Sequence, residues 1–430
     1  MRTYRQLFGI REFRAIFAAN CLAVISASVS SLALGTITYS ATGNPVLTGL
    51  AMFGGPLIRM VASWFLVSAS DFLRPRTALT ALAVVSCVAD LLQSLPGMPW
   101  GLRFVILALP WVVMSATGGA TLALVADILP DGSYVFGRAT LNIAVGGMQI
   151  AGYGLSGILL LSLSTTDLFR CAAVASGAAI VITVRGVGDH PRRASGGSVV
   201  RRARATNRAL LGSPLLRPVF LAGWVPNGLI VGCESLFVPL AGRAAGYLFA
   251  TAAAGMLTGD ILIGRFVSDR LRRALVEPLR FLLAVPYVLF LFHPALAIAA
   301  ALGFVASIGY AASLPLQERL VDRTSPGIRG QVLGLNSAGV TAMQGVAAVL
   351  GGLLAERLAG GPAAAIGLLG CASLVITVAL IPGLCRSRPG HIPAAAPEPA
   401  AGAGRAARPG PAAGPGSDGA DNAEVSVGSG

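Results

Sequence analysis

The sequence contains no lysine, only three histidines, and few charged residues of any kind. Charged residues make up 12% of the 430 residues, whereas soluble domains carry about 25%. Hydrophobic residues make up 55%, and the mean hydropathy is +0.75. This composition excludes an ordinary soluble domain and favours a chain that lies mostly inside a membrane.

Sequence motifs of metal, phosphate and hydrolase chemistry are missing as well. The three histidines (His190, His293 and His391) lie far apart, and no H-E-x-x-H, P-loop or nucleophile elbow occurs. The six cysteines lie in or beside apolar runs, and no two have the spacing of metal ligands. We therefore expect no enzyme, with no catalytic residues, metal or cofactor, and no direct use of ATP.

The net charge of +14 could indicate a nucleic-acid partner. A nucleic-acid-binding protein gathers its basic residues on a reading surface. Here all 32 basic residues are arginines, and most of them lie between apolar runs, where they orient a membrane protein. We expect the lipid bilayer as a partner and no nucleic acid.

Apolar runs close to 20 residues, the length that crosses a hydrocarbon core of about 30 Å, occur along most of the chain. We predict an all-α membrane protein with twelve transmembrane helices in two six-helix halves. The predicted spans cover residues 13–38, 46–68, 78–95, 102–128, 139–163, 167–186, 216–241, 246–268, 277–293, 294–317, 331–357 and 361–383.

The arginines predict the orientation of these spans. If the N-terminus lies inside, 27 of the 32 arginines fall in inner segments and only four in outer ones. Inner loops of membrane proteins carry this excess of basic residues. We therefore predict a multi-pass protein of the plasma membrane with both termini in the cytoplasm.

Two short sequence echoes indicate an internal duplication. Ser70–Arg74 (SDFLR) returns as Ser268–Arg272 (SDRLR), an offset of 198 (268 − 70). Leu141–Ala144, followed by Met-Gln, returns as Leu335–Ala338, again followed by Met-Gln, an offset of 194 (335 − 141). Inherited symmetry of this kind is common in transporters.

The duplication and the composition divide the chain into four parts. We predict a first half at 1–186, a cytoplasmic linker at 187–215, a second half at 216–385 and a disordered tail at 386–430. The linker is rich in arginine and could form an amphipathic helix near Val199–Leu211 on anionic lipid. The tail is too rich in proline, alanine and glycine to fold.

These features resemble the major facilitator superfamily of transporters over about residues 5–385. Phe13-Arg14 and Ala41–Pro45 look like the drug- and siderophore-exporter branch, the macrolide-efflux-like proteins. The loops after the second and eighth spans are similar to the family motif G-x-x-x-D-R-x-G-R-R. The resemblance implies that each loop aspartate meets a helix N-terminus of the opposite half; the alternative is a solvated turn. The candidate gating residues are Asp71, Arg74, Arg76, Asp269, Arg270 and Arg273.

Charged residues inside spans are costly and therefore mark candidate functional sites. The resemblance implies that spans one, four, seven and ten line the cavity, while spans two, five, eight and eleven join the halves. Glu234 and Asp260 rank first as substrate or proton sites, Arg59 follows as an anion contact or counter-ion, and Asp90 in span three ranks last. The alternative is that Asp260 or Arg59 is a structural group bonded to Gln149 or Gln344.

Polar and aromatic residues in the spans extend this candidate site. Amides could bind a solute, although amides also hold membrane helices together. Aromatic rings in cavity-lining spans could stack on an aromatic solute, or could simply pack. The amide candidates are Asn20, Gln149 and Gln344, with Asn142 and Asn336 beside them; the aromatic ones are Trp111, Trp224 and Tyr310.

A mostly apolar chain with few intramembrane charges favours a small amphipathic solute. We expect a secondary transporter that exports a drug or specialised metabolite by alternating access, with protons as a possible coupling ion, and we expect a monomer. The alternatives are an uptake permease for a small solute, or a membrane receptor or scaffold that transports nothing.

Overall fold

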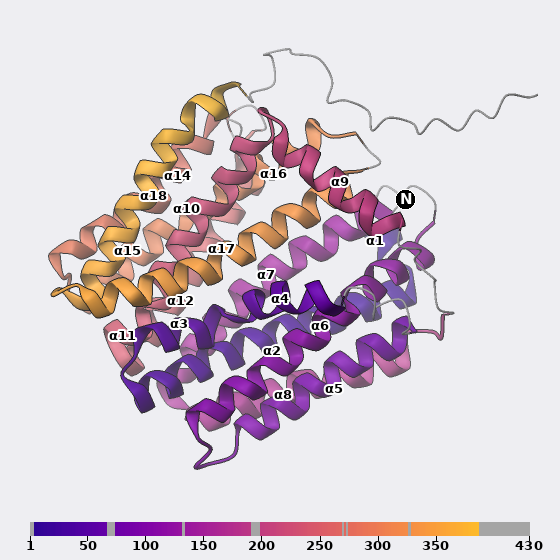
Figure 1. Ribbon diagram of the computed structural model, residues 1–430, viewed down its shortest axis with the longest axis horizontal. Helices are drawn as coiled ribbons and strands as arrows, with labels where there is room; N and C mark the ends of the chain where they lie inside the picture. The colour runs from indigo at the N-terminus through magenta and orange to yellow at the C-terminus, as the bar shows by residue number, and fades with distance from the viewer. Residues whose placement is uncertain are drawn as a thin grey trace, which may run out of the picture. The chain divides into compact units, whose positions relative to one another are not determined.

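The computed structural model describes residues 4–66, 74–130, 134–190, 198–268, 271, 274–325 and 328–386 (Figure 1). These residues lie in one compact unit and form helices, with no strand among them.

The first group of helices, α2–α8, follows a short helix, α1 (Tyr4–Leu7), and precedes the linker helix α9 (Ser198–Gly212). Helix α9 coincides closely with the predicted linker helix. The group consists of α2 (Arg11–Thr42), α3 (Pro45–Phe53), α4 (Gly55–Leu66), α5 (Pro75–Gln93), α6 (Trp100–Ile128), α7 (Tyr134–Ser162) and α8 (Thr165–Gly186).

The second group, α10–α18, contains several helices joined end to end by short 3₁₀ or π turns. It consists of α10 (Arg217–Ser235), α11 (Phe237–Ala241), η2 (Gly242–Ala244), α12 (Ala245–Ile261), the π turn η3 (Leu262–Phe266), α14 (Val276–Val288), η4 (Leu289–Phe292), α15 (Leu296–Ile308), η5 (Gly309–Ala312), α16 (Ser313–Asp322), α17 (Arg329–Arg357) and α18 (Gly361–Arg386).

Eight helical stretches in the described residues are long and apolar enough to cross a membrane, so the chain is a multi-pass membrane protein. One of them, Arg217–Ile261, holds both α10 and α12. The predicted second span is instead two helices, α3 and α4, which are separated at Gly54 in the Gly54-Gly55-Pro56 sequence. The count of twelve spans stays a prediction.

The turn between α2 and α3 shows how local sequence sets the helix ends. Gly43, at φ +63°, ends α2 with its N–H donated to the Tyr39 carbonyl. The Asn44 side chain then accepts the Leu47 N–H at 2.9 Å, and Pro45 occupies the first turn of α3. The chain therefore reverses within two residues.

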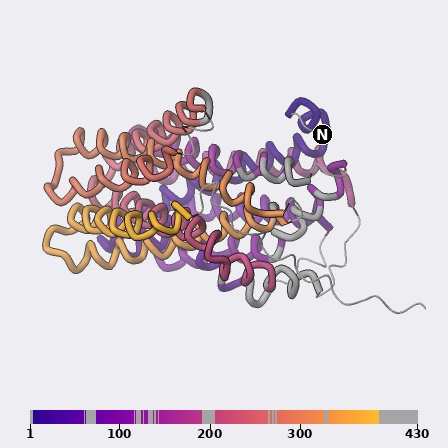
Figure 2. Tube along the Cα trace, turned by 90° about the horizontal axis from the view of Figure 1, so that it is seen from above, coloured from indigo at the N-terminus to yellow at the C-terminus, as the bar shows by residue number. Residues whose placement is uncertain are grey.

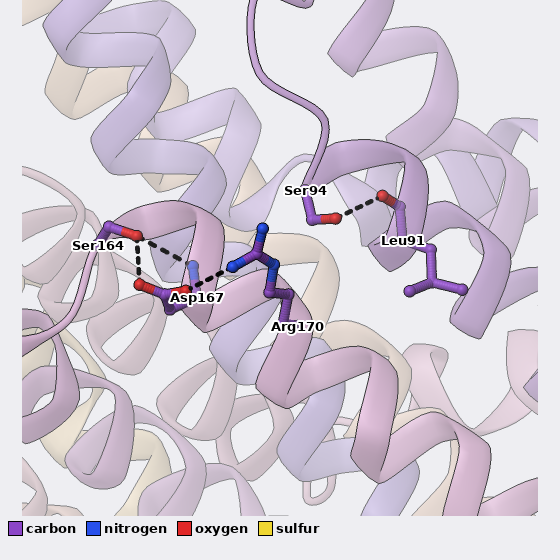
Figure 3. A network of polar contacts seen from close by, with 5 residues as sticks. All are labelled: Leu91, Ser94, Ser164, Asp167 and Arg170. Atoms are coloured by element: carbon purple, nitrogen blue, oxygen red, sulfur yellow. Dashed lines mark hydrogen bonds and ion pairs between the residues drawn. The ribbon is translucent and has the colours of Figure 1, made fainter.

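The turn before α8 is capped by side chains (Figure 3). Ser164 accepts the Asp167 N–H at 3.2 Å and donates its hydroxyl to the Asp167 carboxylate at 2.6 Å. Arg170, one turn later, pairs with the other Asp167 oxygen at 3.0 Å. A carboxylate in the first turn also suits the helix dipole. The predicted turn at residues 164–166 therefore has a local physical cause.

The predicted break between the ninth and tenth spans is confirmed at His293-Pro294. Helix α14 and its 3₁₀ extension η4 end at Phe292, His293 adopts a left-handed conformation at φ +52°, and α15 begins at Leu296. Proline cannot continue the preceding helix and thereby separates the two apolar runs.

The two groups lie side by side, with the first drawn from indigo to magenta and the second from red to yellow (Figures 1 and 2). Helix α7 of the first group packs on α12 of the second, and α3 packs on α17. Helix α2 begins and α18 ends on the same side of the helices, α2 at the right and α18 at the top of Figure 1. We call this the terminal end and the opposite one the far end.

Candidate functional site

The contact between α7 and α12 follows one stripe along each helix. On α12 the stripe is Gly246, Ala250, Ala253, Leu257 and Asp260, at the three- and four-residue spacing of one helix face. Gly246 and Ala253, toward the far end, are buried, whereas Leu257 is 56% exposed. The same face therefore becomes more exposed toward the terminal end.

The facing stripe on α7 changes in the same direction. A Cβ added at Gly157 would lie 2.6 Å from the Gly246 carbonyl oxygen, and one at Gly154 would lie 2.9 Å from the Ala253 Cβ. On the same face but nearer the terminal end, Ile143 is 61% exposed and a Cβ at Gly147 would meet nothing within 4 Å. The two groups therefore touch at the far end and separate toward the terminal end.

The second seam between the groups, α3 against α17, repeats this pattern. A Cβ at Gly49 would lie 2.8 Å from the Ala348 carbonyl oxygen, so the backbones are in direct contact. Nearer the terminal end of α17, Ser337 and Ala338 are exposed. Both seams describe a protein that is closed at the far end and open at the terminal end.

Glu234 lies buried near the far end, one residue before α10 ends. The Tyr310 hydroxyl donates to Glu234 Oε1 at 3.2 Å, and the Tyr287 hydroxyl lies 3.5 Å from the same oxygen. Tyr287 itself is fully buried on α14. A carboxyl group held by two phenols in an apolar bundle can exchange a proton or attract a cationic group.

An aromatic cluster next to Glu234 joins the two groups. Tyr153 of α7 stacks on Phe249 of α12, with ring centroids 6.0 Å apart, and Phe53 lies 5.9 Å from the Tyr153 ring. The Tyr153 hydroxyl lies 3.2 Å from Ser31 Oγ, and its ring system is within electrostatic range of Glu234. Glu234 therefore lies within electrostatic range of Tyr153, a member of this cluster.

Asp260 lies far from Glu234. It is half-buried, 15 residues (260 − 245) after the start of α12. At 1.5 Å per residue this is about 22 Å of helix toward the terminal end. The structure thus brings Glu234 and Asp260 to opposite ends of the helices rather than into one site.

The three predicted amides lie on three different helices, α2, α7 and α17. Gln149 and Gln344 each lie 15 residues after the first residue of their helix (149 − 134; 344 − 329), and both are half-buried, as is Asn20 on α2. None of these three side chains bonds to another residue in the part of the chain that the structure describes. The alternative in which Gln149 or Gln344 neutralises Asp260 or Arg59 is therefore not observed.

Arg59 is exposed on α4, and its Nη1 lies 3.7 Å from the Met114 sulfur of α6. Among the described residues it forms no ion pair. An arginine without a carboxylate partner can meet an anionic group of a solute.

The described part of the candidate gate bonds to α8 and to the start of the linker. Arg74 pairs with Asp189 at 2.5 Å, and Arg76 donates to the Val184 carbonyl at 2.5 Å. The side chains of Arg74 and Arg76 line a shallow hollow together with Thr77 and Thr80. The other gating candidates, Asp71, Asp269, Arg270 and Arg273, lie outside the described residues.

Two of the predicted aromatic residues pack against helices. Trp224 donates its indole N–H to the Asn336 carbonyl at 3.1 Å, and its ring lies against Gly339. Trp111 lies against Gly55 in the same way. Tyr310, the third, is the partner of Glu234. Asn142 has no described side chain.

Sequence reasoning missed a buried charged cluster in the second group. Glu277 and Arg280 of α14 and Arg319 of α16 are 8%, 4% and 2% exposed, and Arg319 Nη1 lies 3.9 Å from Glu277 Oε1. Arg280 and Arg319 lie near the ends of predicted spans, so both were counted among the arginines of inner segments and not as buried charges. The three-residue spacing of Glu277 and Arg280 could have indicated one helix face.

Comparison with known proteins relates the chain to transporters through the fold alone. No family model matches the sequence, and no curated protein matches it either. The structure is similar to that of a POT family transporter in complex with 5-aminolevulinic acid, with a TM-score of 0.65 and 14% identity over 88% of this chain and 97% of that chain.

Two other solved structures are similar over most of their length. A bacterial homologue of the human lysosomal transporter Spinster, inward-facing and unoccupied, has a TM-score of 0.59 and 12% identity over 90% of this chain and 97% of that one. A point mutant of the nucleoside transporter NupG has a TM-score of 0.61 and 12% identity over 86% of this chain and 99% of that one. The chain therefore shares the fold of these membrane transporters; the exporter branch is not determined by these similarities.

Proposed function

We propose that this protein is a secondary transporter that exports a small amphipathic compound by alternating access. The observation that carries the proposal is the pair of continuous stripes on α7 and α12, in contact at the far end and exposed at the terminal end. A transporter that rocks two halves needs one such seam that can close at either end.

The arginine distribution supports a cytoplasmic terminal end, which makes this conformation open toward the cytoplasm. The halves, residues 1–186 and 216–385, would move as two bodies joined by the linker at 187–215. A solute entering from the cytoplasm would first reach Asp260, then the unpartnered Gln149 and Gln344 at mid-depth. The aromatic cluster and Glu234 would be its last contacts before the far end opens.

The residues available to the solute support an amphipathic compound. Rings of Tyr153, Phe249 and Phe53 would pack on its apolar part. Glu234 would attract a basic group on it or carry the proton that drives export. Either role requires only that a carboxyl group is present at position 234.

Uptake of a small solute is the second candidate. The likeness to a POT family transporter holding 5-aminolevulinic acid, which carries an amine and a carboxyl group, supports it. Arg59 and Asp260 supply charges of both signs that have no ion-pair partner among the described residues.

Flux in proteoliposomes under an imposed proton gradient tests the proposal and separates its alternatives. Glu234→Gln and Asp260→Asn should each reduce gradient-driven flux, whereas Glu356→Gln, an exposed glutamate at the far end of α17, should not. The direction of the gradient that drives flux distinguishes export from uptake. Wild-type flux and pH dependence in both variants would contradict the site, and no flux of any tested solute in the wild type would favour a receptor or scaffold.

A further inference from the structure

A second polar centre lies within the first group, away from the seams. Asp90 of α5 is 7% exposed, and it faces Ser26 and Ser176, both 2% exposed, from α2 and α8. Helices α5 and α8 pack mainly on α2, α6 and each other. The centre is therefore separate from Glu234, which lies in the second group.

Five short oxygen contacts define the centre. Ser30 Oγ lies 2.5 Å from Asp90 Oδ1. Ser26 Oγ lies 3.0 Å from Asp90 Oδ2, 3.0 Å from the Ala172 carbonyl oxygen and 2.8 Å from Ser176 Oγ. Ser176 Oγ in turn lies 3.2 Å from Asp90 Oδ2. Each of these contacts is strongest with its own hydrogen between the two oxygens, because a hydrogen shared between two acceptors makes two weaker bonds.

An ionised Asp90 cannot supply these hydrogens. The carboxylate only accepts, so the three serine hydroxyls provide three hydrogens for five contacts. Ser30 uses its hydrogen on Oδ1. If Ser26 donates to Asp90, the lone pairs of Ser26 Oγ face those of the Ala172 carbonyl oxygen. If Ser26 donates to Ala172 instead, its lone pairs face those of Asp90 Oδ2. Two close contacts would lack a hydrogen.

One added proton removes the most costly of these conflicts. The Ser30 contact is the shortest of the five, so the Ser30 hydrogen is assigned to Oδ1, and Oδ2 is free to carry a proton. Oδ2–H can then donate to Ser26 Oγ, Ser26 can donate to Ala172, and Ser176 can donate to Ser26. Only the longest contact, between Ser176 and Oδ2, is left without its own hydrogen.

The charges around Asp90 support the same state. The titratable group in electrostatic contact with it among the described residues is Cys87, on its own helix. Helices α2 and α8 contribute hydroxyls and a carbonyl, while Arg103 of α6 donates to Gln93 and Leu95 instead. A buried carboxylate without a cation costs several kcal/mol, and a neutral acid avoids that cost.

We infer that Asp90 is a proton-binding site of the first group, in which Oδ2 carries a proton and donates it to Ser26. The oxygens lie too close together for a sodium ion, which would have to push them apart. The proton comes from water and returns to it, so the site needs no other reactant. This inference does not depend on the transported solute or on the role of Glu234.

Infrared difference spectroscopy of the whole protein tests the inference. The spectrum of the wild type minus that of Asp90→Asn should show the carbonyl stretch of one protonated carboxylic acid at mildly acidic pH, at which exposed carboxylates stay ionised. Asp167→Asn, which removes an exposed carboxylate paired with Arg170, should show a carboxylate band instead. If Asp90→Asn does not fold, Ser26→Ala should shift the acid band, because the proton loses its acceptor.

Thermal unfolding gives a second readout. The wild-type melting temperature should fall with rising pH more steeply than that of Asp90→Asn, because the folded protein holds a proton that the unfolded chain releases. A carboxylate band for Asp90, or identical pH slopes, would overturn the inference. A melting temperature that rises with sodium at constant ionic strength in the wild type, but not in Asp90→Asn, would overturn it in favour of a sodium site.

Discussion

The closed far end depends on the absence of a side chain at Gly157. A Cβ there would lie 2.6 Å from the Gly246 carbonyl oxygen and 3.2 Å from both the Ala250 nitrogen and the Phe249 Cβ. The first distance is shorter than real contacts allow, and two of these three neighbours are backbone atoms that cannot rotate away. Gly157→Ala should therefore force α7 and α12 apart at the far end.

Overpacking of this kind costs about 1–3 kcal/mol. The cost applies only where the far end is closed, so in the proposed alternating-access cycle it changes the ratio of the two conformations by roughly 5- to 150-fold. The gain in helix propensity from glycine to alanine, about 1 kcal/mol, is present in both conformations and cancels. The population open at the terminal end should fall.

Distances between two spin labels measure this ratio directly. Labels on Gly147→Cys and Leu257→Cys, in a background without the six native cysteines, report the separation of α7 and α12 at the terminal end. Gly157→Ala should move the distance distribution toward the short distance. Gly177→Ala on α8, where an added Cβ meets nothing within 4 Å, is the matched control. A folded Gly157→Ala protein with the wild-type distribution would refute the reasoning.

Three further predictions concern stability and can be checked by thermal or denaturant unfolding in detergent. Asn44→Ala removes the cap of α3 and should cost about 1 kcal/mol, whereas Asn44→Gly should cost only a few tenths. Glu277→Ala removes the carboxylate of the buried pair with Arg319 and should cost about 3–5 kcal/mol; adding Arg319→Met should recover part of that loss, and a further additive loss would argue against a coupled pair. Tyr153→Phe removes one hydrogen bond to Ser31 and should cost about 1 kcal/mol, while Tyr153→Ala should cost more because the ring stack is lost.

The sequence predicted the fold well because its signals were local. Apolar runs and the Gly43-Asn44-Pro45 turn place helix ends without any knowledge of tertiary structure, and His293-Pro294 marks the break that is observed. The same method missed the division at Gly54, because α3 and α4 together form one apolar run. It also could not exclude a bond between Asp260 and Gln149 or Gln344, because such a bond depends on how far apart these side chains lie in the folded protein.

The candidate site was harder to predict because its members come together only in three dimensions. Glu234 was identified as a lone charge, yet Tyr287, its second phenol neighbour, is an ordinary aromatic residue in the sequence. Asp90 ranked last because span three was expected to be peripheral, and the serines that surround it come from residues 26, 30 and 176. From the sequence, only the four-residue spacing of Ser26 and Ser30 was evident, and this spacing does not indicate which residue the two serines contact.

The α7–α12 seam joins its helices through backbone atoms and small side chains, with Gly157 against Gly246 and Gly154 against Ala253. No ion pair bridges these described contacts. Dissolved salt screens charges over about 8 Å at physiological strength, but it has no charge to screen at this seal. A change in salt concentration at the far end should therefore leave the strength of these described contacts unchanged.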